Sequence, residues 1–341
     1  MQTMRGQDMK AAVFDQYGSA QVIHLVDLPK PTPRRDEVLI EVVTTTVNAA
    51  DWRLRSLKVP RGFGPLVRIF MGLTRPRKRI LGVELAGRVV AVGSGVSRFA
   101  VGDDVIAFPG ARLGAHAEFV ALPELVPMIP KPIALNWDEA AALCFGGTTA
   151  IDFLINKGGL QAGEHVLING ASGSVGTAAV QLARSLGAVV TAVCGANQSA
   201  LVERLGADQT IDYSTKDFAR LGQTWDVILD VVGNAPWQRV RQVLNPHGRL
   251  LSVVANLPET LKAVFPRWDN GKRNISGTAR EDVRDLNKLA ELVVSNNYRP
   301  VIDEVFSFDQ IADAHRRFDT GSKHGSLVIH VHTDASAPLE I

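Results

Sequence analysis

Short apolar runs alternate with amphipathic stretches through the middle of the chain. An apolar run at 166–168 precedes a helical pattern at 177–186, and further strand-like runs follow at 188–193, 209–211, 225–232 and 249–254. Helices are predicted between them at 199–205, near 217–221 and at 236–244, and a last edge strand is predicted at 274–277. This alternation predicts an α/β fold with a doubly wound parallel sheet.

Both ends of the chain have β character instead. Strands are predicted at 10–14, 38–43, 86–92, 104–108 and 117–122, then at 301–305 and 327–331 around helices at 281–295 and 308–318. We expect the C-terminal part to rejoin the N-terminal β module. The predicted domains are therefore a β-rich catalytic domain, 1–128 with 278–341, and an inserted Rossmann dinucleotide-binding domain, 129–277.

Two connecting segments carry distinct patterns. Asn136, with Glu139 three residues later, predicts a helix start at 136–143, and glycines and threonines at 146–150 lead to a second predicted helix at 151–157. In the segment 57–80, basic residues alternate with apolar residues. It is interpreted as a solvated loop with a short helix, or alternatively as a lid or a surface for anionic groups.

A glycine-rich turn joins the strand at 166–168 to its helix. Gly173 would let the backbone approach a pyrophosphate, Gly176 would let the helix pack on the strand, and free N–H groups at the helix start attract anionic oxygens. Ala171 replaces the first glycine of the usual G-x-G-x-x-G pattern. The pattern predicts a nicotinamide dinucleotide site, against the alternative of a ligand-free α/β turn. Its residues are Ser172, Gly173, Ser174, Val175 and Gly176.

The amino-acid composition limits the classes of protein to which this chain can belong. A chain of 341 residues with 46% hydrophobic content can bury a large core, and a net charge of +2 argues against nucleic acid as a partner. The apolar runs are too short to span a membrane, and the polar start, before Met9, lacks the apolar region of a signal peptide. The two cysteines, Cys144 and Cys194, are expected to be buried and reduced, and the eight scattered histidines do not suggest a zinc site.

Several motifs resemble those of the medium-chain dehydrogenase/reductase superfamily, in its zinc-independent quinone oxidoreductase-like branch. The matching segments are V-N-A-A-D at 47–51, G-V-E-L-A-G at 82–87, G-D-D-V at 102–105 and G-S-L-V-I at 325–329. The resemblance implies a GroES-like catalytic domain. Asn48 and Val83 stand where zinc enzymes of this superfamily carry metal ligands, so no zinc is expected, and Ser326 replaces the usual lysine.

The resemblance and the side-chain chemistry together assign further residues. Asn48 would be catalytic, holding the nicotinamide or polarising the acceptor, and Arg53 stands where related reductases carry tyrosine that contacts cofactor or acceptor. Thr149 matches a threonine near the nicotinamide, although N-capping of the next helix is an alternative. No proton donor is identified, and Asp51 is interpreted as structural.

The cofactor preference rests on the strand ends. No carboxylate follows the strand at 188–193, so NADP(H) is favoured over NAD(H). The remaining cofactor-binding residues are predicted to be Gly195, Asn197, Tyr213, Lys216, Gly233 and Val254.

The sequence thus predicts a cytoplasmic, homodimeric, zinc-independent NADPH-dependent reductase. It would transfer a hydride to a quinone or to an α,β-unsaturated carbonyl compound. Two alternatives remain open: a zinc-free alcohol or ketone oxidoreductase, and a dinucleotide-binding interaction protein with little turnover.

Overall fold

The computed structural model describes residues 8–264 and 270–332. The predicted extension before Met9 lies outside this range except for Asp8, which belongs to the first strand. The first sheet has six parallel strands in the order β10-β9-β8-β11-β12-β13. The strands are β8 (His165–Asn169), β9 (Val189–Cys194), β10 (Gln209–Asp212), β11 (Trp225–Asp230), β12 (Leu244–Ser252) and β13 (Arg273–Ser276). The helices between them are α5 (Ser174–Ser185), α6 (Ser199–Arg204), α7 (Trp237–Val240) and α8 (Leu257–Val264). The predicted Rossmann-type α/β fold is confirmed, with its reversal of strand order between β8 and β11.

The second sheet gathers strands from both ends of the chain. Its order is β14-β15-β3-β4-β5-β7, and β6 also pairs with β3. The strands are β3 (Glu37–Val47), β4 (Leu85–Val92), β5 (Asp104–Ala107), β6 (Phe119–Pro123), β7 (Met128–Pro130), β14 (Ile302–Ser307) and β15 (Ser326–His330), and a separate hairpin is formed by β1 (Asp8–Phe14) and β2 (Ile23–Pro29). Because β15 pairs with β3, the predicted return of the C-terminal part to the N-terminal module is confirmed. The exact domain boundaries, after residues 128 and 277, stay a prediction.

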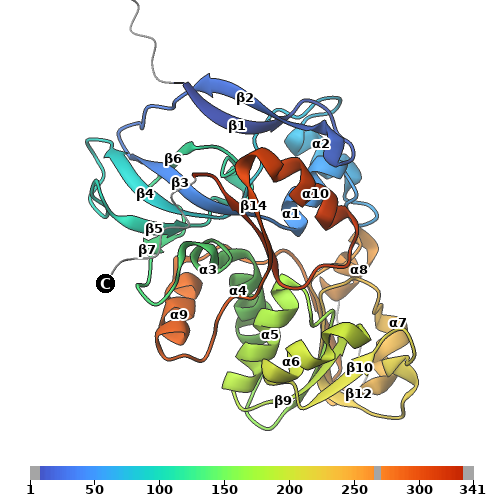
Figure 1. The fold of residues 1–341 in the computed structure, drawn as a ribbon. Coiled ribbons are helices and arrows are strands. Elements are labelled where there is room, and N and C mark those ends of the chain that lie inside the picture. The colour runs from blue at the N-terminus through green and yellow to red at the C-terminus, as the bar shows by residue number, and fades with distance from the viewer. Residues whose placement is uncertain (1–7, 265–269, 333–341) are drawn as a thin grey trace, which may run out of the picture.

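Six further helices flank or connect these sheets. They are α1 (Ala49–Ser56), α2 (Gly64–Met71), α3 (Trp137–Ala141), α4 (Cys144–Ile151), α9 (Val283–Val294) and α10 (Ile311–Asp319). Figure 1 shows the two sheets one above the other, with α3 and α4 between them and α10 back beside α1. The interface between the two parts is thus built by helices from the middle of the chain.

The predicted break at the glycine pair is wrong. Helix α4 runs through Gly146 and Gly147, and a π-helical turn continues it over Asp152–Lys157. A Cβ at Gly146 would lie 2.6 Å from the Ser174 carbonyl oxygen, and one at Gly147 would lie 2.6 Å from Leu289. The glycines therefore serve close helix packing, against α5 and α9, rather than a turn.

Other differences concern element lengths. The predicted helix near 217–221 is only a 3₁₀ turn at Phe218–Arg220, and β11 ends at Asp230 instead of residue 232. Helices α1 and α8 and strands β2 and β7 were absent from the predicted set. The predicted helix start at Asn136 is confirmed, since its side chain accepts from the Glu139 N–H at 2.8 Å.

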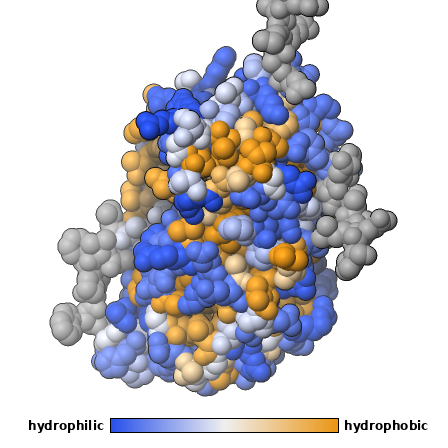
Figure 2. Space-filling view, turned by 90° about the vertical axis from the view of Figure 1, so that its left-hand side faces the viewer, coloured by the Kyte–Doolittle hydropathy of each residue, from blue (hydrophilic) through white to orange (hydrophobic). Residues whose placement is uncertain are grey.

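The surface and the cysteines agree with the composition. Figure 2 shows one face that is mainly hydrophilic, with separate hydrophobic patches. In the described part of the chain, no helix combines the length and apolarity needed to cross a bilayer. Cys144 and Cys194 are free and buried, and burial raises the pKa of both thiols, so neither is an activated nucleophile.

Candidate active site

The glycine-rich turn follows β8, where the strand order reverses. Gly170 has a φ of +88°, so the residue before Ala171 supplies the unusual backbone conformation of the turn. Gly173 is the N-cap of α5 and provides no side-chain cap, and the nearest atom to a Cβ added there is 3.9 Å away. No side chain caps the first turn of α5 and there is room beside Gly173, which fits the predicted pyrophosphate cradle.

Gly176 has the opposite environment. A Cβ at this position would lie 2.1 Å from the Gly170 carbonyl oxygen and 2.6 Å from the Ala171 carbonyl carbon. Both are backbone atoms and cannot move aside. The close approach of α5 to the turn therefore requires glycine here, as the sequence predicts.

The C-terminal segment of the catalytic part reaches this turn. The Gly325 N–H donates to the Ser172 carbonyl oxygen at 2.8 Å, and Gly325 forms a parallel bridge with Gly173. Two residues earlier, the Lys323 ammonium donates to the Gly325 carbonyl oxygen at 2.7 Å and lies 5.1 Å from the centre of the Phe318 ring. The two parts of the molecule thus meet at the predicted cofactor turn, with a lysine beside the contact.

Lys323 is an unusual cation. Burial lowers the pKa of its ammonium to about 8, and the charges of Asp303 and Glu84 act in the opposite direction. No salt bridge of Lys323 is found among the described residues. It is a half-buried positive charge that can hold or release a proton near pH 8.

Asn48 and Glu84 form a buried polar group at the start of α1. The Asn48 side-chain oxygen accepts from the Ala50 N–H at 3.0 Å and the Asp51 N–H at 3.4 Å, which makes it the N-cap of α1. Its amide nitrogen donates to Glu84 Oε1 at 3.3 Å and to Thr46 Oγ1 at 3.5 Å. Asn48 therefore has a structural role, and its predicted catalytic role stays a prediction.

Glu84 connects this group to the helices between the two sheets. Its carboxylate accepts from the Thr46 hydroxyl and, at 2.6 Å, from the Phe145 N–H at the start of α4. Burial raises the pKa of Glu84 to about 7. Glu84 is thus bonded to the N-terminal end of α4, and the same helix packs through Gly146 on the Ser174 carbonyl oxygen of α5.

Arg53 and Thr149 are placed differently by their helices. Arg53, on α1, is partly buried, its pKa is lowered by burial, and it has no hydrogen bond or ion pair within the described residues. Helix α1 itself is tied to α10, since Asp319 accepts from Trp52 at 2.8 Å and from Arg55 at 2.6 Å. Thr149 is buried inside α4, so the alternative role as an N-cap is wrong. The ligand contacts of both residues stay predictions.

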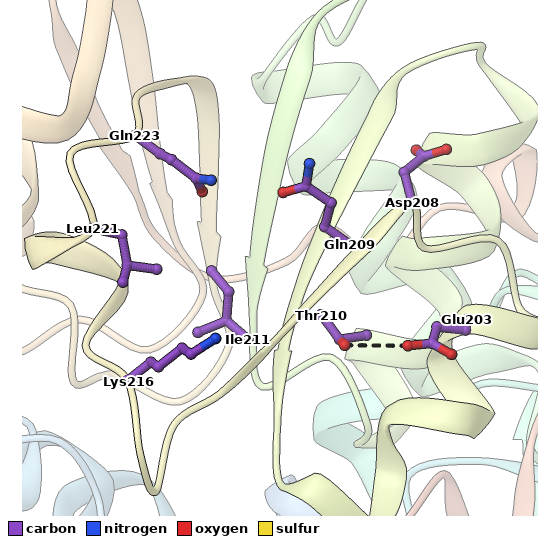
Figure 3. A pocket seen from close by; sticks show the side chains of 8 residues that line it. All are labelled: Glu203, Asp208, Gln209, Thr210, Ile211, Lys216, Leu221 and Gln223. Carbon is purple, nitrogen blue, oxygen red and sulfur yellow. Dashed lines mark hydrogen bonds between the residues drawn. The ribbon is translucent and has the colours of Figure 1, made fainter.

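The predicted cofactor-binding residues that follow β9 and β10 lie in two separate places. A Cβ at Gly195 would lie 3.5 Å from the Tyr213 hydroxyl, so these two residues are neighbours, and Asn197 is exposed in the following 3₁₀ turn. Lys216 instead lies along the outer side of edge strand β10, as Figure 3 shows. There it lines a pocket of about 490 Å³ together with Glu203, Asp208, Gln209, Thr210, Ile211, Leu221 and Gln223.

The loops after β11 and β12 meet at the same edge of the sheet. Gly233 has a φ of +89°, and a Cβ there would lie 2.9 Å from the Val254 side chain. Asp230 fixes the loop, because it accepts from the Asn169 amide at 2.9 Å and from the Gly233 N–H at 3.0 Å. Gly233 and Val254 therefore lie together, at the carboxyl ends of the strands where the prediction puts the cofactor.

Sequence reasoning missed two groups. Glu84 belongs to the G-V-E-L-A-G motif, but the sequence does not indicate that it is buried. Lys323 lies outside the segments that match the family. A signal for Lys323 existed, since it lies two residues before the conspicuous Gly325. Across the ranges 8–264 and 270–332, no three His, Cys, Asp or Glu side chains are grouped as metal ligands.

Comparisons with known proteins agree with this architecture. Residues 34–132 match the model of the alcohol dehydrogenase GroES-like domain, and residues 205–329 match that of the zinc-binding dehydrogenases. The chain is 30% identical to the chloroplast envelope quinone oxidoreductase homolog of Arabidopsis thaliana, over 96% of this chain and 99% of the relative. It is 29% identical to the NADPH-dependent alkenal/one oxidoreductase of the same plant, over 95% of this chain and 80% of the relative.

A solved structure gives the same result. The quinone oxidoreductase from Coxiella burnetii has a TM-score of 0.85 and 28% identity, covering 96% of this chain and all of that chain. The two sheets and the glycine turn define a two-domain oxidoreductase with a nicotinamide dinucleotide as cofactor. The chain belongs to the quinone oxidoreductase-like family of the medium-chain dehydrogenases/reductases, which confirms the predicted resemblance.

Proposed function

We propose that this protein is a zinc-independent, NADPH-dependent reductase that transfers a hydride to a quinone or to an α,β-unsaturated carbonyl compound. The observation that carries the proposal is the contact between the uncapped start of α5 and the segment bearing Lys323. It brings the turn predicted to bind the pyrophosphate and the half-buried ammonium of Lys323 close together. The names of the two Arabidopsis relatives support the same substrate classes.

Each group has a defined task in this proposal. The bound cofactor supplies the hydride. The first N–H groups of α5 hold the pyrophosphate, and Thr149 and Asn48 orient the nicotinamide end. Lys323 meets the negative charge that develops on the acceptor oxygen, and Arg53 lines the acceptor side. Val83 and Asn48, at positions where zinc enzymes carry ligands, support a reaction without zinc.

The test is oxidation of NADPH and NADH by the purified protein against an ortho-quinone, a 2-alkenal and a saturated ketone. We expect rapid NADPH oxidation with the quinone or the alkenal only, unaffected by a chelator. Turnover of the ketone would favour the alcohol or ketone oxidoreductase. Tight NADPH binding without any turnover would favour the interaction protein.

Replacing Gly195 with aspartate tests the cofactor preference. A Cβ at Gly195 would lie 2.6 Å from Gln198 Oε1, the end of a flexible side chain, so the change is sterically tolerable. The new carboxylate would bond the ribose hydroxyls of NADH and repel a 2′-phosphate. We expect KM for NADPH to rise about tenfold or more while KM for NADH falls. Equal KM values for both cofactors in the variant would contradict the proposed phosphate position; Gly195→Asn is the uncharged control.

Replacing Lys323 with methionine tests the proposed cation. We expect kcat/KM for the acceptor to fall by about tenfold to a hundredfold, and Lys323→Arg to retain most of it. The wild-type rate should decline as the pH rises through about 8, where the ammonium loses its proton. Unchanged kcat/KM in the methionine variant would reject this role. A raised Kd for NADPH with unchanged acceptor kinetics would place Lys323 at the pyrophosphate instead.

A homodimer in the cytoplasm completes the proposal. Strand β13 (Arg273–Ser276) is at the edge of the six-stranded sheet, and among the described residues no strand pairs with its outer side. A second copy of the chain could pair there. Light scattering of the purified protein tests the dimer, and a monomer at micromolar concentration would reject it. The relatives named chloroplastic or mitochondrial leave the compartment as a prediction.

A further inference from the structure

Helix α2 presents an apolar stripe to solvent. Leu66, Ile69 and Phe70 follow the spacing i, i+3, i+4 on its outward side, with exposed fractions of 53%, 63% and 52%. Leu73, just past the helix end, extends this stripe and is 62% exposed. A surface helix normally turns such a stripe towards the core. Here the stripe is turned outward, and its four members are large side chains whose exposure is unfavourable in water.

The outward orientation is fixed by contacts on the other side of the helix. Met71 is completely buried, and the Tyr17 hydroxyl donates to the Gly72 carbonyl oxygen at 2.7 Å. The Leu257 N–H, at the start of α8, donates to the Arg61 carbonyl oxygen at 2.9 Å. Figure 1 shows α2 above α8, so the stripe belongs to a lobe that bridges the catalytic and cofactor parts.

The same lobe, residues 58–79, is strongly basic. It contains no Asp or Glu, although the whole chain has a net charge of only +2. Its cations are Lys58, Arg61, Arg68, Arg75, Arg77, Lys78 and Arg79. Within the described residues, Arg79 alone among them forms an ion pair, with Asp15.

Apolar and basic groups alternate within the lobe. The Lys78 ammonium lies 5.0 Å from the centre of the Phe70 ring, and Arg68 donates to the Leu73 carbonyl oxygen at 2.7 Å. The cations therefore lie beside the stripe rather than on a separate face. The partner that fits this pattern has a surface into which large apolar side chains can insert and that carries negative charge around them.

We propose that the lobe of residues 58–79 docks on an anionic lipid bilayer surface, with Leu66, Ile69, Phe70 and Leu73 inserted at the headgroup level. A second copy of this chain is a poor occupant, because two such basic lobes would repel each other. The association is peripheral and does not depend on the proposed reaction. Each cation near anionic headgroups adds to the attraction, and salt weakens it.

The experiment is co-sedimentation of the full-length protein with vesicles of phosphatidylcholine alone, or with about one-third phosphatidylglycerol. We expect binding only to the anionic vesicles, decreasing with salt. The double variants Ile69→Ser with Phe70→Ser and Arg75→Gln with Arg77→Gln should each bind about tenfold more weakly. Ile133→Ser is the matched control, since Ile133 is 94% exposed and lies outside the lobe.

The outcomes separate this proposal from the proposed function. NADPH oxidation with a water-soluble acceptor should be unchanged in both double variants, because none of the four residues is assigned to the active site. No binding of the wild-type protein to anionic vesicles, or equal binding of the apolar variant, would overturn the proposal. A third outcome would show that a second copy of this chain covers the stripe and would overturn the lipid proposal. In that outcome the wild-type protein is a dimer that does not bind vesicles, and the Ile69→Ser, Phe70→Ser variant is a monomer.

Discussion

Replacing Gly176 with alanine is expected to abolish dinucleotide binding and to destabilise the fold. The added Cβ would lie 2.1 Å from the Gly170 carbonyl oxygen and 2.6 Å from the Ala171 carbonyl carbon. These backbone atoms belong to the turn after β8, so relief requires α5 to move away from the sheet. The cost of such overpacking is about 3 kcal/mol or more in the free energy of unfolding. Thermal unfolding and NADPH fluorescence titration measure the two effects.

Gly173→Ala is the matched control for this change. A Cβ at Gly173 meets nothing closer than 3.9 Å, and its φ of −77° suits any residue. The melting temperature should therefore stay equal or rise slightly, because alanine restricts the unfolded chain. NADPH affinity should nevertheless fall about tenfold or more, since the methyl group would occupy the approach to the α5 N–H groups. Wild-type affinity in Gly173→Ala would show that the pyrophosphate does not bind at this turn.

The parallel sheet was predictable because local signals and tertiary structure agree there. Each buried strand is a short apolar run, and Gly187, with a φ of +78°, follows the end of α5 in the left-handed conformation that favours glycine. Helix α1 was missed because its sequence, A-A-D-W-R-L-R-S, has no clear apolar period, and it is positioned instead by the Asn48 cap and the Asp319 contacts. Tertiary contacts override local pattern at such places.

The site was predictable as far as it follows the backbone. The glycine turn and Tyr213 beside Gly195 depend on strand ends, which the sequence locates. Lys323 and Glu84 could not be found that way, because their raised or lowered pKa values arise from burial between segments distant in sequence. At Gly146 and Gly147 the local sequence is misleading, because glycine usually ends a helix. Here both glycines lie inside α4, where they allow close packing against α5 and α9.

Replacing His315 with leucine is expected to stabilise the protein increasingly as the pH falls below about 6.5. His315, on α10, is completely buried, and neither ring nitrogen has a hydrogen-bond partner among the described residues. Its ring packs edge-on against His116 at 5.6 Å. Burial and the charges of His116 and Arg55 hold the pKa of His315 well below its usual range.

The sign follows from proton binding. Below about pH 6.5, His315 binds a proton in the unfolded chain but stays neutral in the folded protein. The free energy of unfolding therefore decreases by about 1.4 kcal/mol for each pH unit below this value. Glu84 acts in the opposite sense. Its folded pKa of about 7 exceeds the ordinary 4.5, so the folded state binds more protons between these values and gains stability as the pH falls. Between about pH 4.5 and 6.5 the contributions of these two groups therefore oppose each other.

Removing His315 should therefore remove its own loss of stability below about pH 6.5. The difference in the free energy of unfolding between His315→Leu and wild type should grow by about 2 kcal/mol from pH 6.5 to pH 5, measured by urea unfolding at each pH. His165→Leu, at an exposed position on β8, controls for the loss of an imidazole and should show no such growth. A pH-independent difference for His315→Leu would mean that the buried ring keeps an ordinary pKa, so that α10 must admit water to it in the folded state.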